Sequence, residues 1–147
     1  MARSLSVKIP TASLIADIEA SLAKIDADVA EYPAQVEKYR LDKAAHEKTV
    51  IQAVIKALSN PDLIGTEYDS PIRVSHNYGN SVQVRVDSDL LGLPEAPKEP
   101  AKPNEHTYFG REYTTRKSLL ERNLKVLRMT SQEEVNATTY NTVIDLL

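Results

Sequence analysis

Hydrophobic residues recur at intervals of three and four along residues 12–59, a stretch that contains no glycine and a single proline, Pro33. This spacing places them on one face of an α-helix, in the heptad pattern typical of coiled coils. The positions of this heptad seam are Ile15, Ile18, Leu22, Ile25, Val29, Tyr32, Val36 and Tyr39. Because the seam keeps its phase through Pro33, we expect one long helix kinked there, with a hairpin of two helices as the alternative.

Strict alternation of polar and apolar residues predicts β-structure in two further regions. Residues 4–9 alternate and indicate a half-buried strand. Residues 72–76 and 81–86 alternate around Asn77-Tyr78-Gly79-Asn80, which favours a turn, and they predict a β-hairpin. Its apolar face would comprise Ile72, Val74, Val82, Val84 and Val86. We expect strand 4–9 to complete a three-stranded antiparallel sheet with this hairpin, packed on the Val50–Leu58 end of the long helix.

A proline-rich stretch divides the chain. Prolines at every third position, Pro94, Pro97, Pro100 and Pro103, are typical of a stiff polyproline II segment. We therefore expect an N-terminal module over residues 1–93, a spacer over 94–104 and a C-terminal arm over 105–147.

The C-terminal arm has the pattern of two short helices. Residues 114–129 carry a leucine stripe, and Ser131 with Glu134 forms a capping-box sequence that predicts a second helix from about Gln132 to Asn141. Forty-odd residues without cysteine seldom support a core alone, so we expect this arm to dock on another subunit or partner. The docking residues would be Leu119, Leu120, Leu124, Leu127, Val143, Ile144, Leu146 and Leu147.

Composition narrows the functional classes. The 147 residues include no cysteine, no tryptophan, 4 glycines and 1 phenylalanine, which leaves little material for a Gly-rich phosphate loop or an aromatic pocket. None of His46, His76 and His106 is four residues from another histidine, as a helical metal site would require. We therefore expect no enzyme activity, no metal and no cofactor. No apolar run is long enough to span a membrane, and residues 1–10 lack the apolar core of a secretory signal.

Basic residues are locally concentrated in residues 105–130, beside three aromatic residues, although the whole chain has a net charge of −3. Basic and aromatic residues together can contact phosphates and bases, so weak, salt-sensitive nucleic-acid binding is one hypothesis for this segment. Docking to an acidic protein surface is the other. The candidate contacts are Arg111, Arg116, Lys117, Arg122, Lys125 and Arg128.

Taken together, these patterns predict an α+β protein that self-associates. At a rise of 1.5 Å per residue the long helix would extend roughly 70 Å, more than the short C-terminal helices can cover. The heptad seam therefore predicts a homo-oligomer, with pairing against the C-terminal helices of the same chain as the alternative.

The stretch Met-Ala-Arg-Ser-Leu-Ser-Val-Lys-Ile-Pro-Thr-Ala, followed by Asp-Val-Ala-Glu-Tyr-Pro-Ala-Gln-Val-Glu-Lys-Tyr, resembles small accessory proteins of actinobacterial (mycobacterial) phages. The resemblance covers about the first forty residues and implies neither an activity nor site residues. It implies one of two roles, a structural part of a virion or a protein that binds and redirects a host factor. The expected location is the host cytoplasm, or the virion for a structural part.

Overall fold

The computed structural model describes residues 8–130 and 132–147 and shows an α+β protein. The chain divides into two compact units, which we call the terminal unit (Met1–Ala34 with Ala101–Leu147) and the central unit (Gln35–Pro100). This division differs from the expected one, because the segment after Pro100 groups with the beginning of the chain and not with a separate arm.

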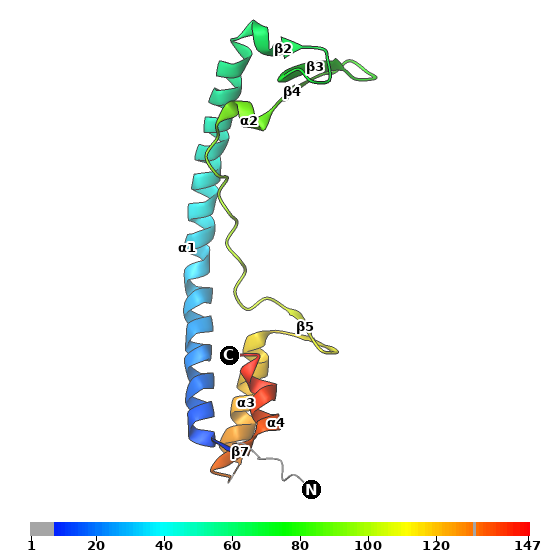
Figure 1. Ribbon diagram of the computed structural model, residues 1–147. Helices are drawn as coiled ribbons and strands as arrows, with labels where there is room; N and C mark the ends of the chain where they lie inside the picture. Colours follow the sequence, from blue (N-terminus) through cyan, green and yellow to red (C-terminus); the bar gives the residue numbers. More distant parts are fainter. Residues whose placement is uncertain (1–7, 131) are drawn as a thin grey trace. The chain divides into compact units, whose positions relative to one another are not determined.

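One helix, α1 (Thr11–Leu58), runs without interruption through 48 residues (Figure 1). Pro33 lies inside it, so the single-helix interpretation is confirmed and the hairpin is excluded. The helix ends at the predicted stop signal, where Asn60 accepts a hydrogen bond from the Asp62 amide and caps a short 3₁₀ turn, Pro61–Leu63. No helix in the described part of the chain is long and apolar enough to cross a membrane.

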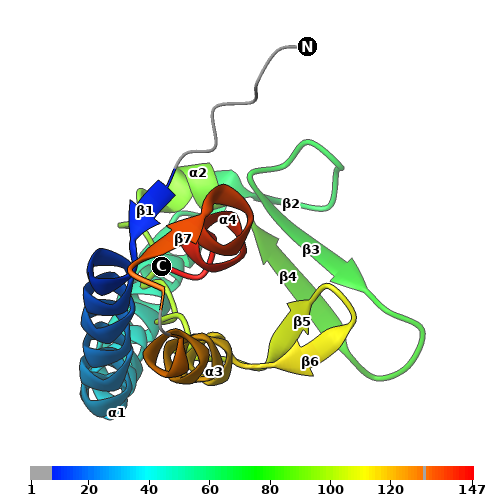
Figure 2. The ribbon, with the colours of Figure 1, turned by 90° about the horizontal axis from the view of Figure 1, so that it is seen from below.

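The terminal unit is held together by elements from both ends of the sequence. Strand β1 (Lys8–Pro10) pairs antiparallel with β7 (Glu134–Asn136), and helices α3 (Arg116–Met129) and α4 (Ala137–Ile144) lie beside the N-terminal part of α1 (Figure 2). A small hairpin of β5 (Thr107–Phe109) and β6 (Glu112–Thr114) precedes α3. The buried core consists of Leu14, Ile18, Ile25, Leu119, Leu120, Leu124, Leu127, Val135, Val143 and Leu146.

The prediction that the N-terminal strand pairs with the hairpin is wrong. Its described residues pair with β7 and not with the hairpin, while residues 4–7 lie outside the described part of the chain. The pairing continues into α1, because the Thr11 amide donates to the Glu133 carbonyl at 2.8 Å and the Thr11 hydroxyl donates to the Gln132 carbonyl at 2.8 Å. These contacts satisfy groups that the first turn of a helix leaves without partners.

The start of the last helix also differs from the prediction. Residues 134–136 are extended as β7, and α4 begins only at Ala137. The N-cap is Asn136, whose side-chain oxygen accepts a hydrogen bond from the Thr139 amide at 2.8 Å. Pairing with β1 takes the Glu134 region into a strand, so the predicted capping box is not used; Ser131 lies outside the described residues.

The central unit contains the predicted hairpin. Strands β3 (Ile72–His76) and β4 (Val82–Val86) pair antiparallel, with Ile72 opposite Val86 and His76 opposite Val82. The third strand of this sheet is the two-residue β2 (Ile64–Gly65), which pairs parallel with β3 and takes the place that the sequence assigned to the N-terminal strand.

The chain then returns along α1. A short helix, α2 (Ser88–Leu91), follows β4, and the proline-rich segment after it runs back beside the helix (Figure 1). Pro97 and Pro100 line a shallow pocket together with Gln35 and Tyr39 of α1. The segment therefore lies against α1, whereas the sequence predicted a spacer that leads away from the first module.

Candidate functional site

The heptad seam is on one face of α1, but its two halves have different surroundings. Ile18 and Ile25 are buried against α3 and α4, and Ile15 and Leu22 pack partly buried beside them. The first half of the proposed oligomer interface is therefore covered by the same chain. The C-terminal helices can reach it because the proline-rich segment brings the chain back.

In the second half of the seam, the side chains are less covered. Val29 and Val36 are exposed, and Tyr32 and Tyr39 are half-buried. These positions could still contact another protein.

The apolar residues of the predicted docking arm are buried, but within their own chain. Leu119, Leu120, Leu124, Leu127, Val143 and Leu146 belong to the core, whereas Leu147 is half-buried and Ile144 is exposed. The expectation that they need a partner surface is thus met by the N-terminal half of α1. Docking on a second subunit is not required to bury them.

The basic residues of 105–130 are largely engaged in contacts within the terminal unit. Arg122 pairs with Glu112 at 2.8 Å, Arg128 pairs with Glu19, and the Arg116 guanidinium donates to the backbone carbonyls of Leu146 and Leu147. The hydrogen bond to Glu112 raises the pKa of Arg122.

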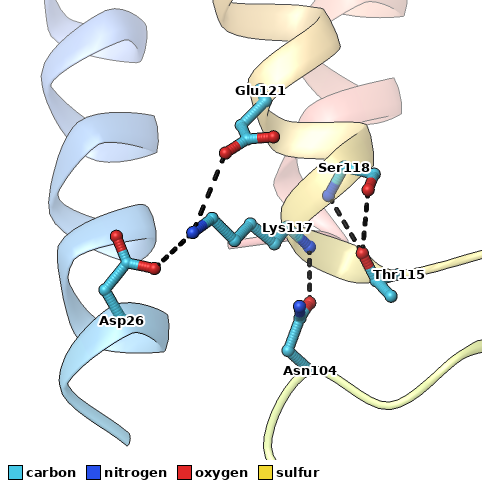
Figure 3. A network of polar contacts seen from close by, with 6 residues as sticks. All are labelled: Asp26, Asn104, Thr115, Lys117, Ser118 and Glu121. Atoms are coloured by element: carbon cyan, nitrogen blue, oxygen red, sulfur yellow. Dashed lines mark hydrogen bonds and ion pairs between the residues drawn. The ribbon is translucent and has the colours of Figure 1, made fainter. Parts of the chain in front are cut away.

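Lys117 is at the centre of a polar network that connects three segments (Figure 3). Its ammonium group contacts the Asp26 carboxylate at 2.5 Å and the Glu121 carboxylate at 3.9 Å, and its amide donates to the Asn104 side chain at 2.9 Å. The hydrogen bond to Asp26 is the main cause that raises the pKa of Lys117.

Of the six predicted contact residues, Arg111 and Lys125 are the two with neither an ion pair nor a side-chain hydrogen bond among the described residues. The other four connect elements of the fold. The geometry therefore gives nucleic-acid binding less support than the sequence did.

Histidines and acidic residues do not gather into a candidate metal centre. In residues 8–130 and 132–147, no group of three such side chains lies close enough together to hold an ion. His106 packs instead against the Tyr113 ring, with 5.7 Å between ring centroids.

The least covered apolar surface of the molecule is in the central unit. Within residues 35–100, all of which the structure describes, Ile72 is the single buried large hydrophobic residue. Eleven others are exposed, namely Val36, Leu41, Ile51, Ile55, Leu58, Ile64, Tyr68, Tyr78, Val82, Val84 and Leu90.

Four of these exposed residues belong to a second stripe on α1, which we call the free stripe. It comprises Leu41, Ala44, Lys48, Ile51, Ile55 and Leu58, again at steps of three and four. The broad apolar face at Val50–Leu58 was the sign of this stripe in the sequence. That face was assigned to packing against the sheet, yet Ile51 and Ile55 remain 57% and 59% exposed.

No protein-family model, curated protein or solved structure matches this chain.

Proposed function

We propose that the protein is a non-catalytic interaction protein that self-associates through its central unit. The observation that carries this proposal is the ratio of one buried to eleven exposed large hydrophobic residues in residues 35–100. Monomeric proteins rarely expose large contiguous apolar patches, and such patches mark interaction surfaces. We therefore place the self-association interface on the part of α1 that the chain leaves uncovered, and no longer on the whole heptad seam.

A second copy of the chain is the occupant that the pattern favours. The free stripe keeps heptad spacing over six positions, which is the arrangement that another helix with the same stripe can pack against. In a two-fold dimer the same patch is used on both subunits, so one stripe is sufficient. Lys48 can lay its aliphatic stem between two paired free stripes and keep its ammonium group in water.

The resemblance to phage accessory proteins supports a structural role in a virion, where repeated copies contact one another. Binding of a host protein by the same surface in the cytoplasm is the second candidate. The exposed strand residues Val82 and Val84 favour it, because they are apolar surface outside the helix stripe that a pairing of two stripes leaves uncovered.

Sedimentation velocity from micromolar to millimolar concentration tests self-association. We expect the wild-type chain to form a dimer or larger oligomer, and Ile51→Asp with Ile55→Asp to be a folded monomer, because burying unpaired charges in an interface is costly. Ala45→Asp with Thr49→Asp, at two exposed positions on α1 outside the free stripe, adds the same two charges at the same spacing and should leave association unchanged.

A wild-type monomer throughout this range would contradict self-association. In that case the surface would be left for a different protein, as in the second candidate.

A further inference from the structure

Two arginines lie opposite each other on adjacent strands of the sheet in the central unit. Arg73 on β3 and Arg85 on β4 are direct partners in the antiparallel register. Opposed residues point to the same face of a sheet with Cβ atoms about 4.5–5.5 Å apart, and like charges in such pairs are destabilising. Among the described residues, neither arginine forms an ion pair with a carboxylate. The opposed pair of positive charges therefore does not stabilise the sheet itself.

Arg73 is held in place while part of its hydrogen-bonding capacity is unused. Its guanidinium lies 5.3 Å from the centroid of the Tyr68 ring, a cation–π contact that orients the planar group. Its Nε is buried and has no hydrogen-bond partner. Buried donors in folded proteins are nearly always satisfied, and an exception calls for an explanation such as an ion or ligand.

The arginines open onto a pocket of about 420 Å³. Its lining includes Tyr68, Ser70, Arg73, Arg85, Asp87 and Ser88. Two guanidinium groups and two serine hydroxyls thus supply hydrogen-bond donors. Asp87 is the acidic group of the lining, and its carboxylate already accepts the Asp89 amide at 3.3 Å as the N-cap of α2.

Gly65 lies next to Arg73 at the edge of this sheet. The residue is the β2 partner of Arg73, so no side chain stands beside Arg73 on that edge. A Cβ atom at Gly65 would lie 2.4 Å from the Ser70 hydroxyl oxygen, so a larger residue at position 65 would require the Ser70 side chain to move. On the other side the Asp87 amide donates to the Pro71 carbonyl at 2.9 Å and ties β4 to the loop before β3.

We propose that this pocket binds a phosphate monoester, with Arg73 and Arg85 both donating to its oxygens. The planar N–H forks of arginine match phosphate oxygens in pairs, and an oxyanion between two guanidinium groups removes their repulsion. A tetrahedral phosphate has three terminal oxygens and can accept from both arginines and a serine hydroxyl together. A carboxylate has two oxygens and satisfies one fork. This inference is independent of self-association.

Titration of the full-length protein by NMR tests the site, at constant ionic strength because salt screens exposed charges. The probes are methyl phosphate as the monoester, dimethyl phosphate as a diester like that of a nucleic-acid backbone, and acetate as a carboxylate. We expect methyl phosphate to bind most tightly and to shift the Arg73 Nε–H, Gly65 and Ser70 signals.

Variants of the full-length protein assign the effect to the pocket. Arg85→Gln should weaken methyl phosphate binding by about tenfold or more, as expected for losing a charged hydrogen bond. Asp87→Asn retains a good N-cap and removes the negative charge, so it should tighten binding. Lys98→Gln, which also removes one positive charge from the central unit, should change the affinity less than about twofold.

A stability measurement separates ligand binding from a structural role. Without phosphate, Arg85→Gln should raise the thermal midpoint because it removes the like-charge pair. Equal affinity of wild type and Arg85→Gln for methyl phosphate would overturn the proposal. Equal or tighter binding of dimethyl phosphate or acetate would overturn the assignment to a phosphate monoester.

Discussion

At the scale of single residues, burial decides the cost of a substitution more than residue type does. Leu120 and Val126 are aliphatic residues of the same helix, α3, yet Leu120 is 0% exposed and Val126 is 62% exposed. Truncating a buried side chain removes its apolar contacts and leaves a cavity, whereas an exposed side chain has few contacts to lose.

We predict that Leu120→Ala lowers the free energy of unfolding by about 2–5 kcal/mol. Val126→Ala is the matched control and should change it by less than about 0.5 kcal/mol. Urea denaturation followed by circular dichroism measures both values. Similar losses for the two variants would mean that α3 does not pack on α1 as described.

A second prediction concerns Lys117 and pH. Its pKa is raised above 10.5 in the folded protein, mainly by the Asp26 hydrogen bond, so the contact contributes fully below that pH and is lost as pH rises through the folded pKa. The stability difference between wild type and Lys117→Gln should therefore be constant near neutral pH and shrink above pH 10.5. Lys125→Gln, which has no ion pair among the described residues, should show no such trend. A constant Lys117 difference through pH 12 would contradict the contact.

At the scale of elements, α1 contains a helix-breaking residue in its interior. Pro33 cannot donate the backbone hydrogen bond to Val29, and its ring crowds the preceding turn. The helix continues because many other turns, and the core on its N-terminal half, support it.

We predict that Pro33→Ala raises the free energy of unfolding by roughly 1–3 kcal/mol, because it restores the missing hydrogen bond. Helix content by circular dichroism should not fall. Ala34→Gly, at the neighbouring exposed position, should act in the opposite direction by about 1 kcal/mol. A destabilised Pro33→Ala variant would show that the chain needs a bend at this point.

Local patterns predicted individual elements better than their pairing. The 3.6-residue periodicity predicted α1 and α3, and alternation around Gly79 predicted the β3–β4 hairpin, because both depend on neighbours in the sequence. The partner of β1 depends on which distant backbone edge is free. A three-residue strand such as β7 has too few residues to show alternation, so the β1–β7 pair was missed.

The candidate surfaces were likewise only partly predictable from local patterns. The seam and the leucine stripe were each predicted to be buried. The leucine stripe is buried and so are Ile18 and Ile25 of the seam, whereas Val29 and Val36 are exposed. Periodicity shows that a face is apolar but does not tell which other apolar face covers it, within the chain or between chains. The Arg73–Arg85 pair was missed because opposition across two strands follows from the hairpin register, where both residues occupy polar positions.

At the scale of the whole molecule, the terminal unit requires both ends of the sequence. Residues 119–146 provide seven of the ten buried core residues, and the other three are Leu14, Ile18 and Ile25. A fragment that ends at residue 104 would expose these side chains to water.

We predict that the 1–104 fragment loses helix at the N-terminal end of α1 and aggregates. This differs from the sequence analysis, which treated residues 1–93 as a module of their own. Adding the 105–147 peptide should restore the lost helix, as judged by circular dichroism. Hydrogen exchange should show the recovered protection at residues 14–25. A fragment with full protection there on its own would contradict this prediction.

The distance along the chain between the two halves of this core has a consequence for synthesis. The ribosome delivers Ile18 roughly 100 residues before Leu119, which at about 5–20 residues per second is a delay of roughly 5 to 20 s. During that delay the apolar face of the nascent helix is without its intramolecular partner. Synthesis of residues 119–146 thus completes this core, and a product that is stalled or truncated before them presents an exposed apolar helix face to chaperones and proteases.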